Sequence, residues 1–282
     1  MNRPDDISPL ARLMRRVEGA APDPGFTDSL ATSFPSIDAA LGGGLRRGDF
    51  VLLGGETGSG KSSLALAMAL RMAAAGLQVT FQSQEMTVER LLERALAIDG
   101  RCRVDDLRGD TLTEAARVGV AAAALRLRER SPRLETMITG GTEPLAHALR
   151  SEAGLQVAFV DPVQALATGG AQREEDMAGV ALTLKRLALD LDIALVATAQ
   201  TTHVPSAKND RRPVLDDFGA MGALRQHADV VLGLYREEMF HPGSGVDGAT
   251  ELLLLKNRNG RPGYVDLYFY EHCLRFEDLL DR

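Results

Sequence analysis

The stretch GGETGSGKSS, from Gly54 to Ser63, decides how this chain is organised. It fits the pattern G-x-x-x-x-G-K-[ST] through Gly55, Gly60, Lys61 and Ser62. An apolar run, DFVLLG, leads into the glycines and a helix-forming stretch follows, so backbone N–H groups can face nucleotide phosphates at a helix amino terminus. We expect Lys61 to reach the terminal phosphates and Ser62 to hold Mg²⁺. The expected nucleotide-binding residues are Gly55, Glu56, Thr57, Gly58, Ser59, Gly60, Lys61, Ser62 and Ser63.

The composition restricts the classes of function. The chain has 282 residues, 45% of them hydrophobic, and a net charge of −7, so it can form a full core but is no general coat for nucleic acid or anionic membranes. Its start, MNRPDDISPL, lacks the apolar segment of a signal peptide, and no apolar run approaches the roughly 20 residues of a membrane helix. We expect a cytoplasmic protein without membrane contact. Cys102 and Cys273 are far apart in sequence, and neither they nor the histidines show zinc-ligand spacing, so buried free thiols are expected.

Apolar strand-like runs alternate with helix-like runs, which is typical of an α/β fold with a mostly parallel sheet and helices on both faces. The expected strands are 49–54, 78–83, 157–161, 193–200 and 229–235. The expected helices, in which alanine and leucine supply helix propensity, are 61–75, 88–97, 113–130, 144–153 and 174–191. Near the carboxyl end, ELLLLK and YVDLYFY predict an antiparallel hairpin that turns at Asn259 and Gly260.

The first 31 residues are expected to stand apart from the main domain, which spans residues 32–282. In the segment SPLARLMRRVEG, the apolar residues Leu10, Leu13, Met14 and Val17 recur at helical spacing, with arginines on the other side. The turn-rich stretch DPGFTDSLATSFP follows. We expect a short amphipathic helix on a linker, which packs either on its own domain or on a neighbouring subunit.

Three polar residues stand at predicted strand ends, where ligands of open α/β sheets bind. Asp161 closes VAFVD and suits a ligand of Mg²⁺ beside Ser62. Glu85 follows VTFQSQ and could polarise a water in line with a γ-phosphate, or it could simply cap a helix. Gln200 ends LVATAQ and could report the presence of a γ-phosphate, or it could be an ordinary strand-end amide. With the phosphate loop, these residues predict nucleotide hydrolysis.

Five blocks, found in one order, carry a family resemblance. They are TSFPSIDAALGGGLRRGDFVLLGGETGSGKSS, FQSQEMTVERLLERALA, VAFVDPVQAL, LVATAQTTHVPSAKNDRRPVLDDFGAMGALRQHADVVLGLYRE and LLLLKNRNGRPGYVDLYFYEHCLRFEDL. From about Thr32 onward, the chain resembles the carboxy-terminal motor domain of DnaB-type replicative helicases. The resemblance implies a RecA-like P-loop core, ATP and Mg²⁺ as cofactors, self-association into a hexameric ring, and threading of single-stranded DNA.

The same resemblance implies roles for individual residues. Glu85 matches the catalytic glutamate of the family, Asp161 the Walker B aspartate and Gln200 the sensor glutamine. Lys256 and Arg258 match a basic finger pair that reaches into a neighbour's site. Because these two residues are two positions apart at the end of an apolar strand, their side chains are expected on one side of the hairpin, although solvated cations flanking a turn are the alternative.

Two features depart from the helicases. The segment before the core is too short for their amino-terminal helical domain, so a stand-alone motor domain is expected. The region LGGGLRRGDFVLLGGETGSGKSS is also similar to the RadA and KaiC branches of the superfamily, yet the zinc motif and protease-like domain of RadA have no counterpart in the sequence.

Two loops at the same predicted sheet edge could contact nucleic acid. The segment TTHVPSAKNDRRPVLDD carries Lys208, Arg211 and Arg212, and the segment VQALATGGAQREE offers Arg173. Repeated around a ring, such cations can follow a phosphate backbone without strong sequence preference. Solvated surface turns are the alternative.

The expected function is that of an ATP-hydrolysing RecA-like ring motor acting on single-stranded DNA, with a protein loader or partner also conceivable. The competing interpretation is a KaiC-like or RadA-like regulatory or recombination ATPase, whose ring binds a protein partner or recombination intermediate without processive unwinding. The basic loop favours the first interpretation and the acidic net charge favours the second. A small-molecule kinase fits less well, because no lid or acceptor-site segment is evident in the sequence.

Overall fold

The structure is a computed structural model of the chain. It describes Leu10, Met14 and residues 28–109, 111–137, 141–167, 173–201, 210–219, 223–243 and 245–280, without the side chains of 173–175. The predicted amphipathic helix lies outside the described residues, except that Leu10 and Met14 are helical and exposed. Lys208 also lies outside them.

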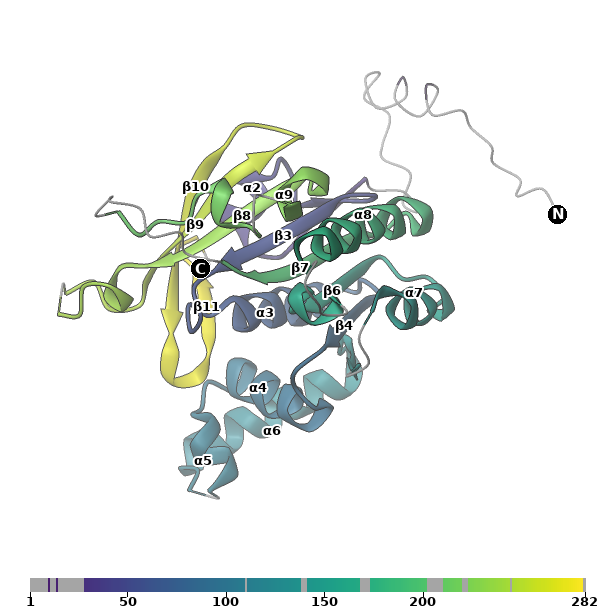
Figure 1. Cartoon of the computed structure of the whole chain (residues 1–282). Helices are drawn as coiled ribbons and strands as arrows, with labels where there is room; N and C mark the ends of the chain where they lie inside the picture. The colour runs from purple at the N-terminus through teal and green to yellow at the C-terminus, as the bar shows by residue number, and fades with distance from the viewer. Residues whose placement is uncertain are drawn as a thin grey trace.

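A nine-stranded sheet runs through the molecule in the order β11-β10-β9-β8-β3-β7-β6-β4-β5 (Figure 1). The six strands from β8 to β5 are parallel, and β9, β10 and β11 are antiparallel. The strands are β3 (Phe50–Gly55), β4 (Val79–Ser83), β5 (Arg133–Thr136), β6 (Val157–Asp161), β7 (Ala194–Gln200), β8 (Val230–Arg236), β9 (Ala249–Asn257), β10 (Gly263–Tyr270) and β11 (Arg275–Asp278). The predicted α/β fold, with its mostly parallel sheet and antiparallel hairpin, is confirmed.

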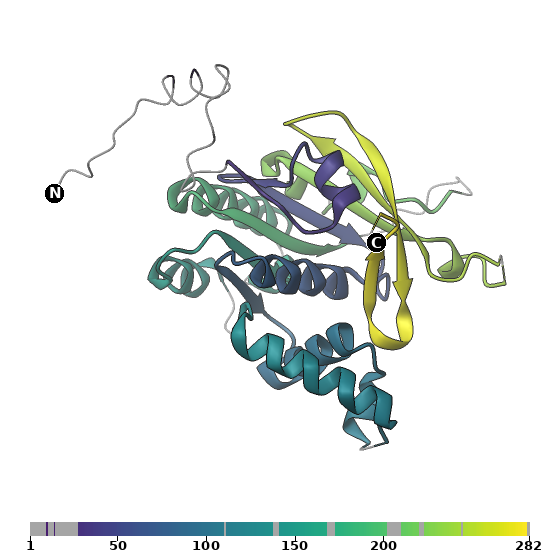
Figure 2. The same ribbon diagram turned by 180° about the vertical axis from the view of Figure 1, so that it is seen from behind.

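Helices lie on both faces of the sheet (Figures 1 and 2). They are α2 (Pro35–Ala40), α3 (Lys61–Ala74), α4 (Val88–Gly100), α5 (Val104–Arg108), α6 (Glu114–Glu129), α7 (Thr142–Ser151), α8 (Arg173–Leu191) and α9 (Ala223–His227). One core joins α2, α3 and α4 to the sheet, and the other joins α7, α8 and α9 to it. Helix α6 packs on α4 at the outside.

Strand β3 lies at the centre of both cores because its side chains alternate between the two faces of the sheet. Val51 and Leu53 belong to the core that contains α3, and Phe50 and Leu52 belong to the core that contains α8. All six residues of β3 are buried. A strand that is apolar on both faces is typical of a parallel sheet covered by two helical layers.

The structure contains several strands that were not predicted from the sequence. The short strand pair β1 (Ser29–Leu30) and β2 (Leu45–Arg46) is antiparallel and contributes Leu30 and Leu45 to the core. The hairpin between β9 and β10 has a third strand, β11, beside it. Its connection spans residues 258–262, so Asn259 and Gly260 lie in a longer loop and not in a two-residue turn.

Within the described ranges, no helix has the length and apolar composition needed to cross a membrane. The same ranges contain no group of three or more histidine, cysteine, aspartate or glutamate side chains arranged to hold a metal ion. Cys102 and Cys273 are buried and not disulfide-bonded.

Candidate nucleotide-hydrolysis site

The phosphate loop joins β3 to α3, and the predicted nucleotide-binding residues 55–63 run from the last residue of β3 to the first turn of α3. Gly58 and Gly60 have φ values of 83° and 99°, in the left-handed region that favours glycine. A Cβ atom on Gly60 would lie 2.9 Å from Cζ of Phe276, so the loop sits tightly against β11. The first N–H groups of α3 have no carbonyl partner within the helix, which suits the binding of an anion.

Lys61 lies over this loop. Its Nζ donates a hydrogen bond to the carbonyl oxygen of Glu56 at 2.7 Å. Burial lowers the pKa of Lys61, and the negative charges of Asp161, Glu56 and Glu85 oppose that shift. Ser59 Oγ is buried and has no hydrogen-bond partner among the described residues. An amine beside carboxylates and an unsatisfied buried hydroxyl are groups that bound phosphates can satisfy.

The carboxylate of Asp161 lies next to the phosphate loop. Ser62 Oγ donates to its Oδ1 at 2.9 Å, and Thr198 Oγ1 donates to the same oxygen. Asp161 is 3% exposed, and burial raises the pKa of its carboxyl group. The hydrogen bonds and the positive charges of Lys61 and Arg94 oppose that shift. A carboxylate and a hydroxyl at this separation are hard oxygen ligands, so Asp161 and Ser62 fit Mg²⁺.

Glu85 lies in the turn between β4 and α4, and its side chain is exposed. The hydroxyl of Ser83 accepts hydrogen bonds from the backbone N–H groups of Glu85 at 3.4 Å and Met86 at 2.8 Å, which fixes this turn. The Glu85 carboxylate acts electrostatically on Lys61. The fold therefore brings Glu85 to the same end of the sheet as the phosphate loop, where its carboxylate could orient a water.

Gln200, at the end of β7, is bonded directly to the loop. Its Nε2 donates to Thr57 Oγ1, and the N–H of Thr201 donates to the Gly55 carbonyl at 3.1 Å. On the other side, Gln164 Nε2 donates to the Gln200 carbonyl at 2.9 Å. Gln200 thus connects the phosphate loop to the segments that follow β6 and β7.

Arg94 in α4 is a site residue that the sequence analysis missed. Burial lowers its pKa, and the negative charge of Asp161 is the largest opposing influence. Arg94 lies at helical spacing among Leu91, Ala95 and Ile98, which are all buried. A charged residue inside an apolar helical stripe is the sequence signal that could have identified it.

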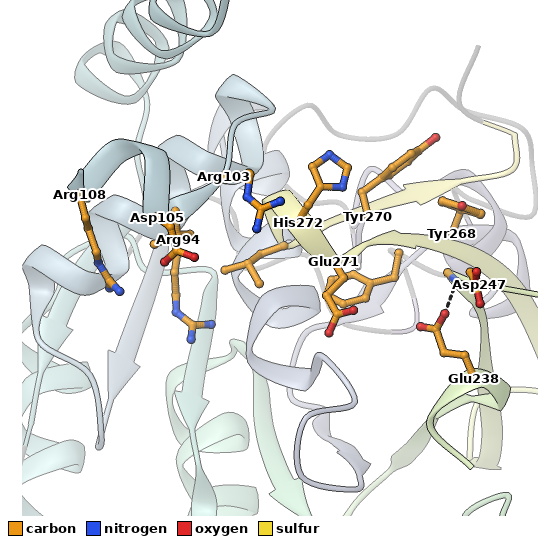
Figure 3. A pocket seen from close by; sticks show the side chains of 14 residues that line it. Arg94, Arg103, Asp105, Arg108, Glu238, Asp247, Tyr268, Tyr270, Glu271 and His272 are labelled. Carbon is orange, nitrogen blue, oxygen red and sulfur yellow. Dashed lines mark hydrogen bonds between the residues drawn. The ribbon is translucent and has the colours of Figure 1, made fainter. Parts of the chain in front are cut away.

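A cleft of about 770 Å³ opens beside Arg94. Figure 3 shows Arg94, Arg103 and Arg108 on one side, together with Asp105, and the rings of Tyr268 and Tyr270 at the end of β10 and of His272 after it on the other. The rings of Tyr268 and Tyr270 have centroids 4.6 Å apart. Carboxylates line the cleft as well, from Asp105, Glu238, Asp247 and Glu271, so its arginines and aromatic rings suit a flat group such as a nucleotide base more than an anion.

The basic pair at the end of β9 lies elsewhere. Lys256 Nζ donates to the Arg225 carbonyl at 2.7 Å, and Arg258 Nη1 lies 3.1 Å from Asp229 Oδ1. Both side chains therefore turn towards α9 and the start of β8. Asp229 donates its N–H to the Phe50 carbonyl, so this pair lies at the amino end of β3, whereas the phosphate loop follows the carboxyl end.

The candidate nucleic-acid residues have different surroundings. Arg211 is exposed. Arg212 forms a two-bond ion pair with Glu251 at 2.7 and 2.6 Å, and its guanidinium lies over the ring of Tyr235. Glu251 raises the pKa of Arg212 through these bonds. Arg173 begins α8, but its side chain is outside the described part, and so is Lys208.

Comparison with known proteins identifies the family. A family profile described as the DnaB-like helicase C terminal domain matches residues 29–278. "Replicative DNA helicase DnaB" of Geobacillus stearothermophilus is 25% identical over 262 residues, covering 90% of this chain and 58% of that protein. The chain therefore spans less than two thirds of the length of this relative.

Two solved structures share the fold. The first, described as an ATPase domain, has a TM-score of 0.86 and 24% identity, covering 98% of this chain and all of that one. "The Structure Of A DnaB-Like Replicative Helicase And Its Interactions With Primase" has a TM-score of 0.86 and 23% identity, covering 98% of this chain and 68% of that one. With the profile match over almost the whole described core, this chain belongs to the DnaB-like helicase C-terminal domain family and is a P-loop ATPase.

Proposed function

We propose that this chain is a subunit of a hexameric, ATP-hydrolysing ring motor that moves along single-stranded DNA in the cytoplasm. The observation that carries the proposal is the position of Arg258 relative to Lys61. The two lie at opposite ends of β3, so the Arg258 side chain is remote from the phosphate loop of its own chain.

The separation follows from strand geometry. Strands β3 and β8 run parallel with Val51 opposite Val230 and Gly55 opposite Leu234. The five steps from Phe50 to Gly55 span roughly 17 Å at about 3.3 Å per residue. Arg258 can therefore stabilise a transferring phosphoryl group only in another subunit's site. A surface that acts on a different surface of an identical neighbour makes a head-to-tail interface, and such interfaces form rings when the rotation between subunits closes.

In the proposed reaction, each side chain of the loop has a separate role. Lys61 would leave the Glu56 carbonyl and bind the terminal phosphates of ATP. Ser62 and Asp161 would hold Mg²⁺, which neutralises charge on the phosphates when bound. Glu85 would orient the attacking water, and Gln200 would exchange its bond to Thr57 for one to the γ-phosphate. We place the base of the nucleotide in the cleft beside Arg94.

The proposal for DNA rests on two loops that leave neighbouring strands. They follow β6 and β7, and the bond from Gln164 to the Gln200 carbonyl joins their bases. Arg211 is exposed just beyond the second loop, and Lys208 and Arg173 are the other cations that we propose for contact with DNA. Curated relatives are named as replicative DNA helicases, which supports DNA as the polymer.

The ion pair between Arg212 and Glu251 favours a second candidate, because it neutralises one of the cations expected to bind DNA. In that candidate, the ring is a KaiC-like or RadA-like regulatory ATPase that binds a protein partner. A loader or another replication protein is compatible with either. The two candidates differ in whether single-stranded DNA changes turnover.

Mixing two inactive variants tests the shared site. Arg258→Ala should bind ATP but not turn it over, and Glu85→Gln should bind ATP and hydrolyse it at least ~100-fold more slowly. In an equal random mixture, roughly a quarter of the head-to-tail interfaces would combine an intact Glu85 with an intact Arg258. We expect the mixture to recover ATPase activity. If native mass spectrometry shows that mixed rings form, but the ATPase rate of the mixture does not exceed the rates of the two variants alone, the proposal of a site shared between subunits is wrong.

The choice of polymer is tested by ATPase rates with and without oligo(dT) and oligo(rU), over a range of salt concentrations. Stimulation by oligo(dT) that declines with salt is expected for the motor. An ATPase rate that neither oligonucleotide changes would favour the regulatory ATPase.

A further inference from the structure

We infer that Asp229 is the positioning residue for Arg258, holding the guanidinium at the angle from which it meets a neighbouring subunit's nucleotide. This inference rests on the proposed function of Arg258. Asp229 precedes β8 and its side chain is only 5% exposed, although Arg258 is half exposed. A buried carboxylate that faces an exposed arginine is suited to orienting that arginine, because its own position is fixed by packing.

The carboxylate of Asp229 is held on its inner side. Lys185 Nζ in α8 donates to Oδ2 at 2.7 Å, and the Phe50 N–H donates to the same oxygen at 2.8 Å. Lys185 is in turn fixed by a 2.8 Å bond to the Gly48 carbonyl. The inner oxygen is therefore committed to the fold, and the outer oxygen, Oδ1, is left to face Arg258.

Among the residues that the structure describes, Arg258 is bound along one edge of its guanidinium. Nη1 lies 3.1 Å from Asp229 Oδ1 and Nη2 lies 3.4 Å from the Gln226 carbonyl. These bonds use two of the five N–H donors of the guanidinium. The backbone N–H of Arg258 also donates to the Asp229 carbonyl at 3.0 Å, so the residue is held at both its main chain and its side chain. The remaining donors stay available for phosphate oxygens of a neighbour.

The surroundings also favour a directed guanidinium. Asn259 Nδ2 donates to Asp49 Oδ2 at 2.5 Å, which anchors the next residue of the loop. Lys256 adds positive charge near Arg258, and the negative charge of Asp229 offsets it. Asp229 thus opposes a local repulsion as well as supplying a hydrogen bond.

The substitution Asp229→Asn separates orientation from folding. Two donors, Lys185 and the Phe50 N–H, face the inner oxygen, so the amide oxygen will take that place and the amide NH₂ will face Arg258. A donor then opposes a donor, and Arg258 is released. Because a misplacement of about 1 Å can cost 10²-fold in rate, we expect kcat to fall by about 10- to 100-fold with the KM for ATP within about 2-fold.

The matched control is Asp216→Asn. Asp216 pairs with Arg225 in an exposed ion pair near the same loop, but does not contact Arg258. Its ATPase rate should stay within about 2-fold of the unmodified protein, since exposed ion pairs contribute little. Thermal unfolding of both variants checks that they are folded at the assay temperature. If Asp229→Asn is not folded at that temperature, Asp229→Glu replaces it in the same assays. This substitution keeps the negative charge but displaces the carboxylate by one methylene.

Subunit mixing identifies the defect. Asp229→Asn subunits should regain activity when mixed with Glu85→Gln subunits, which contribute a correctly held Arg258. They should not regain activity with Arg258→Ala subunits, because every subunit of that mixture lacks either Arg258 or the carboxylate that orients it. This pattern, together with the loss in kcat, would support the inference.

Three results would overturn it. If Arg258→Ala is inactive but Asp229→Asn matches Asp216→Asn, the positioning role is wrong and the shared site stands. If Asp229→Asn is rescued by neither partner, or by both, its defect is general and not one of the finger. If Arg258→Ala retains full turnover, the proposed finger fails and the role of Asp229 fails with it.

Discussion

We expect Gly60→Ala to destabilise the domain by about 2–5 kcal/mol. Gly60 has a φ of 99°, and an L-residue in a left-handed conformation costs roughly 1–2 kcal/mol. The new Cβ would lie 2.9 Å from Cζ and 3.2 Å from Cε2 of Phe276. That ring is 1% exposed and stacked on Phe269 with centroids 4.3 Å apart, so it has little space to retreat. Overpacking of this kind costs roughly 1–3 kcal/mol more.

The assay is thermal unfolding of the nucleotide-free protein, followed by circular dichroism. At roughly 2–4 °C per kcal/mol, Gly60→Ala should lower the melting temperature by about 4–20 °C. The control is Gly179→Ala in α8, where a Cβ would meet nothing within 4 Å. Because alanine favours a helix by up to about 1 kcal/mol over glycine, the control should melt at the same temperature or slightly higher.

Equal melting temperatures for the two variants would refute this reasoning. A second comparison tests the contact with the ring alone. In a Phe276→Leu background, Gly60→Ala should cost less, because the edge of the ring has been removed. An unchanged cost would mean that the ring does not obstruct position 60 and that only the backbone conformation matters.

Three further substitutions test the site. Lys61→Ala should abolish binding of a fluorescent ATP analogue, because it removes the cation facing the phosphates; unchanged affinity would refute the phosphate loop. Burial raises the pKa of Asp161, so the charged form of its carboxyl group is disfavoured in the ligand-free fold. Asp161→Asn should therefore raise the melting temperature of the ligand-free protein, and should abolish the further rise that Mg²⁺ and ATP give. A lower melting temperature of the ligand-free variant would contradict this. Arg211→Ala combined with Arg212→Ala should weaken oligo(dT) binding, measured by fluorescence anisotropy, and reduce its salt dependence, because fewer counterions are released; an unaltered salt slope would mean that the two arginines do not contact the DNA backbone.

The sequence predicted the centre of the sheet well and its edges poorly. Strands β3, β6 and β7 are continuous apolar runs because helices cover both faces, and such runs are visible in the sequence. Strand β5 reads RLET, with charges that pair across Arg133 and Glu135, so it carries no apolar run. Its strand conformation depends on pairing with β4, which only the fold supplies.

The same distinction applies to the site. Asp161 and Gln200 were predictable because each ends an apolar strand, and parallel strands bring their carboxyl ends to one edge. Arg94 reaches that edge from a helix, and its position depends on how α4 packs on α3. The pairing of Arg212 with Glu251 joins a loop to β9 across 39 residues, which no local pattern indicates.

The two bonds of Gln200 bear on how a small movement could spread. Its amide holds Thr57, while its carbonyl holds the side chain of Gln164. The amide and the carbonyl belong to one residue at the end of β7, so a single residue links the phosphate loop to the segment after β6. The side-chain amide can exchange partners at the loop while the backbone carbonyl keeps its bond to Gln164. A displacement of the Gln200 backbone, in contrast, would act on both contacts, and the segments that follow β6 and β7 meet at this one position.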